Sequence, residues 1–396
     1  MIGADSYVPH ADAIASTFRT EGWKLELFIV SKEERPVVSE RQLRRMAHSI
    51  DGLQLLSPQL LPTDKLFAPS FWQQFEAAFL GLHGTLAKKV LDLHKCQQRR
   101  NSKTPLTICC FPGVSYYLQT YGQWLRAGAD IVLFNEPRTY KDYKRINRIF
   151  SNKPPDNSLI FGYPTLTNLD KKSDNNKSIL YIDQNILPKG YKNRRNLTRK
   201  LFDLAEARPD ATLRILARNK PTENSNHNAP DRTHIQFLVD EVRRTRKETS
   251  NIIVEYGPPR EYLPEASLCI GITSTILLHS MYLGIPTVPL RIKGVRGEFN
   301  GFNLFQKSPM AMAIDDLISL KSIPALDHAW TCENILATDE IAKAQLRKFI
   351  ICNLERRKTK SDTYLIYDLF PHLTKLAFSL VDFILHFRIG IRSFRA

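Results

Sequence analysis

The sequence has no apolar run of the length that crosses a membrane. A bilayer span needs roughly 18 to 20 consecutive apolar residues. The nearest approach, residues 376–387, is shorter and is interrupted by Asp382 and His386. The first residues, MIGADSYVPH, also lack the basic start and the apolar core of a signal peptide. We therefore expect a cytoplasmic protein that is attached, at most, to the surface of a membrane.

Cysteine is scarce, and its spacing fits neither a metal site nor a disulfide framework. The six cysteines include no CxxC pair and no Cys/His pattern with the spacing of zinc ligands. Cys109 and Cys110 lie in an apolar run, which predicts two buried thiols in a strand. We therefore expect a reducing compartment and no bound metal.

Acidic residues are too few to balance the basic ones. Lys and Arg number 56 against 40 Asp and Glu, which gives a formal net charge of +16. This excess favours an anionic partner: nucleic acid, an anionic membrane surface or a phosphorylated small molecule. The sequence contains no zinc finger, RNP-like motif, helix-turn-helix signal or basic–aromatic repeat, so we expect no specific nucleic-acid partner.

Short apolar runs alternate with helical patterns, which is typical of α/β proteins. With 396 residues, 43% of them hydrophobic and 24% charged, the chain is expected to form two or three globular domains. In the first half we expect strands at 25–30, 53–56, 106–111, 131–134 and 159–161, and helices at 11–20, 40–48, 71–94, 115–127 and 141–150. In the second half we expect strands at 178–183, 212–217, 251–255, 266–272 and 287–290, and helices at 194–207, 234–247 and 275–283.

Two such series joined by a polar segment predict two doubly wound, Rossmann-like domains that face one another across a cleft. The expected division is a first domain at 1–168, a linker at 169–177, a second domain at 178–350 and a helical tail at 351–396. Only four residues precede Asp5, which lies on the loop after the first expected strand. Either this strand is very short or the chain begins further upstream, and we favour the second alternative.

The segment with the strongest chemical signal is ASLCIGITSTILLHSMYLGIPTVPLR, residues 266–291. An apolar strand is followed by the hydroxyl residues Thr273, Ser274 and Thr275, and then by an amphipathic helix that ends near Gly284. Hydroxyls at a helix N-terminus cap unpaired N–H groups, and the same N–H groups bind phosphate. Capping alone and phosphate binding are both open interpretations of this helix start.

This pattern of strand, hydroxyl pair, helix and LGIPTV resembles the donor half of GT-B glycosyltransferases. In those enzymes the hydroxyl pair and the helix N-terminus hold the nucleotide phosphate. Bacterial sialyltransferases, Kdo transferases, UDP-sugar epimerases and the glycerol-phosphate polymerases of teichoic acid synthesis have comparable segments. The resemblance implies a GT-B fold and assigns Thr273, Ser274 and Thr275 to the donor phosphate.

Two further segments resemble the same donor domain. ILYIDQN is similar to its opening strand, and the resemblance places Gln184 and Asn185 in the donor cleft. LARNKP carries Arg218 and Lys220 where relatives contact phosphate or base, and His227 follows. A solvated basic loop is the alternative interpretation of these cationic side chains. The Ser-Thr pair favours a CMP-sugar as donor, and the lack of a His-Pro dipeptide keeps UDP- and GDP-sugars open.

The first half resembles the acceptor domain of these enzymes. The segments ADSY, FPGVSYYLQTY, RAGADIVLFNE and FGYP occur there in order. They match an uncharacterised bacterial group of surface-polysaccharide glycosyltransferases, and the resemblance covers roughly residues 4 to 290. It implies that the nucleotide-sugar is a substrate and not a cofactor, that no metal is required, and that the acceptor is a surface glycan or is lipid-linked, as in lipopolysaccharide.

A sugar transfer that inverts the anomeric centre needs a base for the proton of the acceptor hydroxyl. Asp5 is the candidate, because strand-end loops of the first domain are expected to line the cleft and Asp5 lies on the first of them. The alternative interpretation of Asp5 is a turn or a helix cap. Glu136 is the reserve candidate. The leaving phosphate needs cations, hydroxyls or helix N-termini, and the sequence contains all three.

Basic clusters occur at residues 41–48, 192–200 and 356–360, and solvated faces or contact with a membrane-borne acceptor would explain them. The apolar and aromatic stretch 376–395 ends in arginines, so it suits an interfacial helix on anionic lipid or a terminal helix packed on the first domain. We expect a GT-B glycosyltransferase of polysaccharide biosynthesis, peripheral on the inner face of the plasma membrane. The alternatives are a non-catalytic sugar-nucleotide-binding protein and a nucleic-acid-binding protein.

Overall fold

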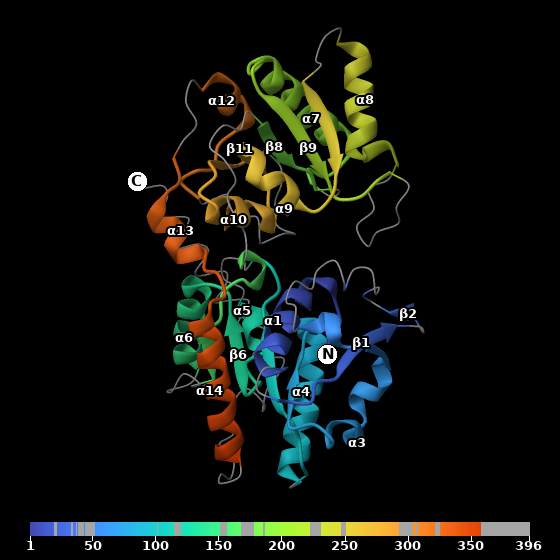
Figure 1. Ribbon diagram of the computed structural model, residues 1–396, viewed down its shortest axis with the longest axis vertical. Helices are drawn as coiled ribbons and strands as arrows, with labels where there is room; N and C mark the ends of the chain where they lie inside the picture. Colours follow the sequence, from blue (N-terminus) through green and yellow to red (C-terminus); the bar gives the residue numbers. More distant parts are fainter. Residues whose placement is uncertain are drawn as a thin grey trace. The chain divides into compact units, whose positions relative to one another are not determined.

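The chain forms two compact units (Figure 1). Unit 1 comprises residues 1–167 and 336–396, and unit 2 comprises 168–335. The structure, a computed structural model, describes residues 1–19, 22–32, 35–36, 38, 43, 52–100, 102–114, 120–150, 157–167, 178–184, 187–221, 231–246, 251–292, 304–305, 308–320 and 325–357. The expected linker at 169–177 and the stretch at 376–395 lie outside these ranges.

Unit 2 contains a parallel sheet with the strand order β10-β9-β8-β11-β12. Its strands are β8 (Ser178–Ile182), β9 (Thr212–Ala217), β10 (Ile252–Tyr256), β11 (Ala266–Gly271) and β12 (Thr287–Pro289). The first strand, β8, lies in the middle, and all five of its residues are buried. A continuous apolar run is what a strand covered on both faces requires. The order is that of a Rossmann-like domain.

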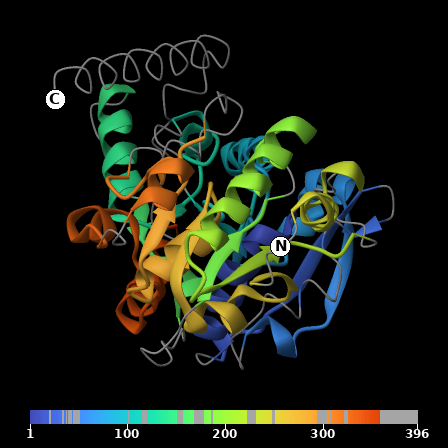
Figure 2. The ribbon, with the colours of Figure 1, turned by 90° about the horizontal axis from the view of Figure 1, so that it is seen from above.

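The α-helices of unit 2 lie between and after these strands in the chain (Figures 1 and 2). They are α7 (Tyr191–Glu206), α8 (Ile235–Thr245), α9 (Pro259–Tyr262), α10 (Thr275–Tyr282), α12 (Ile314–Ser319) and α13 (His328–Asn334). In α7, Leu197, Leu201, Leu204 and Ala205 recur at the three- and four-residue spacing of one helix face, and all four are buried. This spacing explains why a helix of such polar composition packs firmly on the sheet.

Unit 1 contains a second parallel sheet, with the order β4-β5-β6-β7. Its strands are β4 (Ala77–Phe79), β5 (Leu106–Cys110), β6 (Ile131–Phe134) and β7 (Ser158–Ile160). Three further strands form the group β2-β1-β3, namely β1 (Leu27–Lys32), β2 (Arg35–Pro36) and β3 (Pro58–Pro62). Cys109 and Cys110 are buried free thiols in β5, as expected.

The segment Met1–Gly3 joins these two groups of strands. Ile2 forms parallel bridges to Ile29 on one side and to Gly81 on the other. The N–H of Ile2 donates to the carbonyl of Phe28 at 2.9 Å, and the N–H of Gly3 donates to the carbonyl of Gly81 at 2.7 Å. This segment takes the place of the first strand in the order of the sheet. Unit 1 therefore has the same reversal of strand order around its first strand as unit 2.

The helices of unit 1 follow the alternation that the sequence predicts. They are η1 (Asp5–Tyr7), α1 (Val8–Arg19), η2 (Leu53–Leu55), η3 (Thr63–Phe67), α3 (Pro69–Trp72), α4 (Gly84–Arg99), α5 (Thr120–Trp124), α6 (Pro137–Phe150), η4 (Pro164–Leu166) and α14 (Glu340–Arg357). The last of these, α14, packs on α1 and β5. The second domain was expected to extend to residue 350, whereas residues 336–350 belong to unit 1.

Two expected elements of the first half differ from the structure. The strand expected at 53–56 is the 3-10 turn η2, and the strand lies at Pro58–Pro62 instead. Its two prolines are tolerated because β3 is an edge strand. The single helix expected at 71–94 is divided into α3, β4 and α4, because Ala77–Phe79 pairs with β5.

The two chain segments that connect the units run together on unit 1. Tyr163 and Ala337 form a parallel bridge, and the N–H of Tyr163 donates to the carbonyl of Leu336 at 2.7 Å. Gly162 has a φ of +84°, and a Cβ atom there would lie 2.6 Å from the carbonyl carbon of Ala337. This close approach of two backbones requires glycine.

We predict that Gly162→Ala destabilises unit 1 more than Gly22→Ala does. Gly22 has a similar φ of +76° but no atom within 4 Å of an added Cβ, so its substitution introduces only backbone strain of about 1–2 kcal/mol. Gly162→Ala adds a steric clash to that strain. Differential scanning calorimetry should show at least twice the decrease in melting temperature for Gly162→Ala. Equal decreases would mean that the two connecting segments are not held together at this glycine.

Candidate functional site

The turn between β11 and α10 carries the three hydroxyl residues that were singled out in the sequence. Ser274 is the N-cap of α10, and its Oγ accepts a hydrogen bond from the N–H of Ile276 at 3.3 Å. Thr273, Ser274 and Thr275 are all partly exposed. The cap is therefore present, and it leaves the hydroxyls of Thr273 and Thr275 without a partner among the described residues.

Gln184 connects this turn to the end of β8. Its Nε2 donates to the carbonyl of Thr273, and its Oε1 accepts from the N–H of Thr273, each at 3.0 Å. β9 and β11 lie on opposite sides of β8, so the order of the strands reverses between β8 and β11. Ligands of doubly wound sheets bind outside the carboxyl ends of the strands at this reversal. The paired Gln184 and Thr273 lie at that point of unit 2.

A buried ion pair fixes the loop that carries Gln184. Arg194 Nη2 donates to both carboxylate oxygens of Asp183, at 3.0 and 2.9 Å, and both side chains are almost fully buried. The guanidinium also donates to the carbonyls of Gln184 and Leu187. Burial raises the pKa of Asp183, and the charge of Arg194 opposes that rise. Arg194 therefore sets the path of the chain as it leaves β8.

The loop after β9 contributes the cationic residues. Arg218 and Lys220 are exposed there, on either side of the buried Asn219. His234 Nδ1 accepts from the N–H of Gln236, so its Nε2 carries the proton and donates to the carbonyl of Asn219 at 2.9 Å. The ends of β8, β9 and β11 thus bring together Gln184, Arg218, Lys220 and the hydroxyl turn at one edge of the sheet. Asn185 and His227 lie outside the part of the chain that the structure describes.

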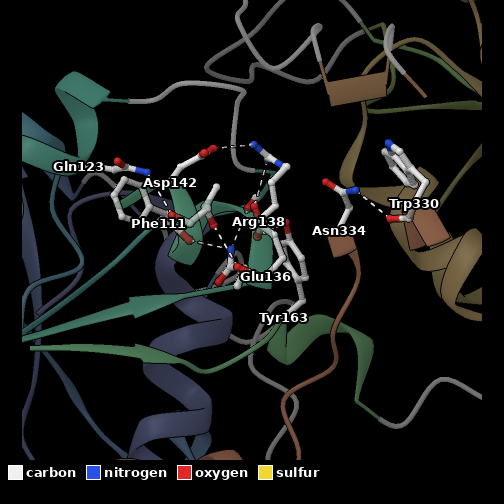
Figure 3. A network of polar contacts seen from close by, with 11 residues as sticks. Phe111, Gln123, Glu136, Arg138, Asp142, Tyr163, Trp330 and Asn334 are labelled. Carbon is white, nitrogen blue, oxygen red and sulfur yellow. Dashed lines mark hydrogen bonds and ion pairs between the residues drawn. The ribbon is translucent and has the colours of Figure 1, made fainter. Parts of the chain in front are cut away.

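In unit 1, Asp5 begins η1 directly after the short first strand, at the reversal of strand order. The carboxylate of Asp5 lies outside the part of the chain that the structure describes. Glu136 follows β6 and is buried. Tyr163 Oη donates to its Oε2 at 2.9 Å, and Arg138 Nη2 lies 3.3 Å from its Oε1 (Figure 3). Both carboxylate oxygens of Glu136 are therefore occupied.

His10 is a candidate functional residue of unit 1 that reasoning from the sequence missed. Asn135 Nδ2 donates to the carbonyls of Phe111 and Gly113, both at 2.9 Å, which fixes the orientation of its amide. Asn135 Oδ1 therefore accepts from His10 Nε2 at 2.7 Å, and the lone pair lies on His10 Nδ1. Burial lowers the pKa of His10 to about 4, so the ring is neutral at pH 7. In the sequence, only its position five residues after Asp5 marks His10. Its partner Asn135 is 125 residues away, so no local pattern connects the two.

Two absences concern the described residues alone. In those ranges, no cluster of three or more His, Cys, Asp or Glu side chains could hold a metal ion. No helix within them is long and apolar enough to cross a membrane.

Both units have the doubly wound order of a Rossmann-like domain, and two such domains make up GT-B glycosyltransferase folds. The chain belongs to the family described as "Putative glycosyltransferase (DUF6716)", whose model matches residues 2–349. No curated protein matches the chain in sequence.

Solved structures show the same fold. A "putative UDP-N-acetylglucosamine 2-epimerase" from Listeria monocytogenes is 11% identical, with a TM-score of 0.54, over 92% of this chain and 98% of the other. MurG of Acinetobacter baumannii is 12% identical, with a TM-score of 0.51, over 88% and 96%. The lipopolysaccharide outer core galactosyltransferase WaaB is 11% identical, with a TM-score of 0.51, over 89% and 98%. At such low identity, these similarities concern the fold alone.

We predict that His10 makes the protein less stable in mild acid. The pKa of His10 is about 4 in the folded state and about 6.5 when unfolded, so the unfolded chain binds one more proton between these values. The stability due to this residue is complete above pH 6.5 and is lost as the pH falls to 4, by roughly 3 kcal/mol. Urea unfolding at several pH values gives the free energy of unfolding as a function of pH. Between pH 6.5 and 4 this free energy should fall less steeply in His10→Gln than in the parent protein. An unchanged slope would contradict the burial of this ring.

Proposed function

We propose that the protein transfers a sugar from a nucleotide-activated donor to a surface glycan or a lipid-linked acceptor. The observation that carries the proposal is the turn after β11, where hydroxyls and a helix N-terminus meet Gln184 at the reversal of strand order. Phosphate binds at such positions because the N–H groups and the helix dipole favour negative charge. Membership in the glycosyltransferase family supports the same reaction.

The hydrogen bonds of the turn define which groups would hold the donor phosphate. The N–H of Thr273 already donates to Gln184, and the N–H of Ile276 donates to Ser274. The N–H groups of Ser274 and Thr275 and the hydroxyls of Thr273 and Thr275 have no partner among the described residues. These four groups would bind the phosphate, with Arg218 and Lys220 supplying positive charge. Asn185 and His227 lie outside the described residues, and their part in the donor cleft stays a prediction from the sequence.

Charge stabilisation by these residues would replace a metal ion. The leaving nucleotide gains negative charge as the glycosidic bond breaks, and fixed donors and cations lower the energy of that state. The Ser274–Thr275 pair favours a CMP-sugar as donor. The similarity to an enzyme named for UDP-N-acetylglucosamine keeps a UDP-sugar as the second candidate.

Asp5 is the proposed base for the acceptor hydroxyl. It follows the central strand of unit 1 at the position where doubly wound sheets bind ligands. Glu136 remains the reserve candidate, although its carboxylate would first have to leave Tyr163 and Arg138. If neither acts as a base, either a different residue does so or the protein is a non-catalytic sugar-nucleotide-binding component of a polysaccharide assembly complex.

Basic side chains of unit 1 support a location at an anionic membrane. Lys141, Arg145 and Arg148 are exposed on α6 of unit 1. In unit 2, Lys192 and Arg199 are exposed on α7. Such residues attract anionic lipid within about 10 Å at ordinary salt concentration. The proposed setting is therefore lipopolysaccharide or other surface-polysaccharide synthesis at the inner face of the membrane.

We predict that one nucleotide among CMP, CDP, UDP and GDP raises the melting temperature. A ligand at about 100 times its dissociation constant stabilises a protein by roughly 2.7 kcal/mol. The double variant Ser274→Ala/Thr275→Ala should lose most of this shift, because it removes the hydroxyl of Thr275 and the Ser274 cap that fixes the start of α10. Asp327→Ala is the matched control, because it removes the N-cap of α13 in the same unit without touching the turn. A nucleotide shift that persists in the double variant would show that the phosphate binds elsewhere.

We predict that Asp5→Asn lowers the rate of sugar transfer about 10²- to 10⁴-fold, the usual contribution of a general base. The nucleotide-induced thermal shift should be retained, since the donor residues are in unit 2. The measurement is the rate of nucleotide release in the presence of an acceptor. The variant Glu136→Gln is assayed under the same conditions. Full activity of Asp5→Asn with loss in Glu136→Gln would exchange the two roles, and full activity of both variants would exclude both residues as the base.

A further inference from the structure

Three arginines are buried in the described part of the chain, and one of them has no acidic partner. Their exposed fractions are 6% for Arg126, 5% for Arg138 and 3% for Arg194. Arg138 forms ion pairs with two carboxylates, and Arg194 forms a bidentate pair. No carboxylate among the described residues forms an ion pair with Arg126. No described residue therefore compensates its positive charge with an ion pair.

The contacts that Arg126 makes with described residues are with neutral groups. Nη2 donates to Tyr7 Oη at 2.9 Å, and this hydroxyl donates to the carbonyl of Leu82 at 2.7 Å. Nη1 donates to the carbonyl of Gly122 at 3.0 Å, and the guanidinium lies 4.8 Å from the centre of the Phe111 ring. The buried Nε has no partner in the described part of the chain. A buried charge without a counter-ion is strongly unfavourable, so an anion at this position would relieve a large cost.

The N-terminus of α4 adjoins the same guanidinium. A Cβ atom on Gly84, the first residue of this 16-residue helix, would lie 3.1 Å from Arg126 Nη1 and 2.7 Å from Leu125 Cδ1. The N-cap residue His83 makes no side-chain capping bond, and the first turn contains no acidic residue. The positive end of a long helix thus lies beside a guanidinium that forms no ion pair with a described residue. Two positive charges so close together are unfavourable unless an anion is bound between them.

We propose that Arg126 and the N-terminus of α4 bind an oxyanion, a phosphate or carboxylate group, of the acceptor. The inference rests on the proposed function in one respect, namely that unit 1 binds the acceptor. Because Gly84 has no side chain, the guanidinium of Arg126 can lie close to the start of α4. The first N–H groups of α4 supply hydrogen-bond donors beside this guanidinium. The site lies at the carboxyl ends of the unit 1 strands, since α4 follows β4 and Phe111 follows β5. It would select an acidic glycan or a phosphate-linked acceptor over a neutral sugar.

Arg126→Met in the full chain tests this assignment, with inorganic phosphate and acetate as probes. In the parent protein, phosphate or acetate at about 100 times its dissociation constant should raise the melting temperature by roughly 5 °C or more. Arg126→Met should lose most of that rise. Without any anion its melting temperature should equal or exceed that of the parent, because removal of an unpaired buried charge is neutral or stabilising. The stronger probe identifies phosphate or carboxylate as the preferred group.

Arg138→Met is the matched control, a buried arginine of the same unit whose removal breaks the buried ion pair with Glu136. It should melt at a lower temperature than the parent and keep the response to the anion. If Arg126→Met is destabilised in the same way and still responds fully to phosphate, Arg126 is a structural residue and the proposal is wrong. If the response disappears in Ser274→Ala/Thr275→Ala and persists in Arg126→Met, the anion binds in unit 2. The acceptor subsite would then be refuted while the donor site stands.

Discussion

Both units depend on a central strand from which the sheet extends in two directions. In unit 2 this strand is β8, which hydrogen-bonds to β9 on one side and to β11 on the other. In unit 1 it is the short segment around Ile2, which bridges to Ile29 and Gly81. Parallel pairing aligns the carboxyl ends of neighbouring strands, and the reversal of order separates the loops above them. The positions of Asp5, Gln184 and the hydroxyl turn all follow from this constraint.

Buried charges then fix the loops at the strand ends. The pair Asp183–Arg194 holds the exit of β8, and the pair Glu136–Arg138 holds the exit of β6, where Tyr163 adds a hydrogen bond. Such pairs contribute little net stability, yet breaking one leaves an uncompensated charge and costs several kcal/mol. They therefore specify loop geometry more than they stabilise the fold. Arg126 departs from this pattern, which is why it suggests a ligand and not a scaffold.

Elements with strong local signals could be predicted from the sequence. Residues 131–134 and 212–217 are strands at the expected limits, because short apolar runs bounded by polar residues are distinctive. The start of α10 was also correct, since Ser274 is a capping residue that follows an apolar strand. The strand β3 was missed because two prolines conceal an exposed edge strand, and β4 was missed because three residues cannot be distinguished from a helix in an apolar context.

The parts of the site that could not be predicted depend on partners far apart in the sequence. Arg126 meets Tyr7 across 119 residues, and His10 meets Asn135 across 125. Neither contact leaves a periodic or local pattern, and the lack of an ion pair between Arg126 and the described carboxylates can be seen only in the folded structure. The return of residues 336–357 to unit 1 is similar, because the sequence of a helix does not reveal which surface it covers.

The central claim is that the start of α10 binds the phosphate of a nucleotide-sugar. A crystal structure with the nucleotide that binds most tightly would test it directly. We expect phosphate oxygens within hydrogen-bonding distance of the N–H groups of Ser274 and Thr275, at the end of β11 and beside Gln184. A nucleotide bound away from this turn, or tight binding of nucleic acid in place of any nucleotide, would contradict the claim.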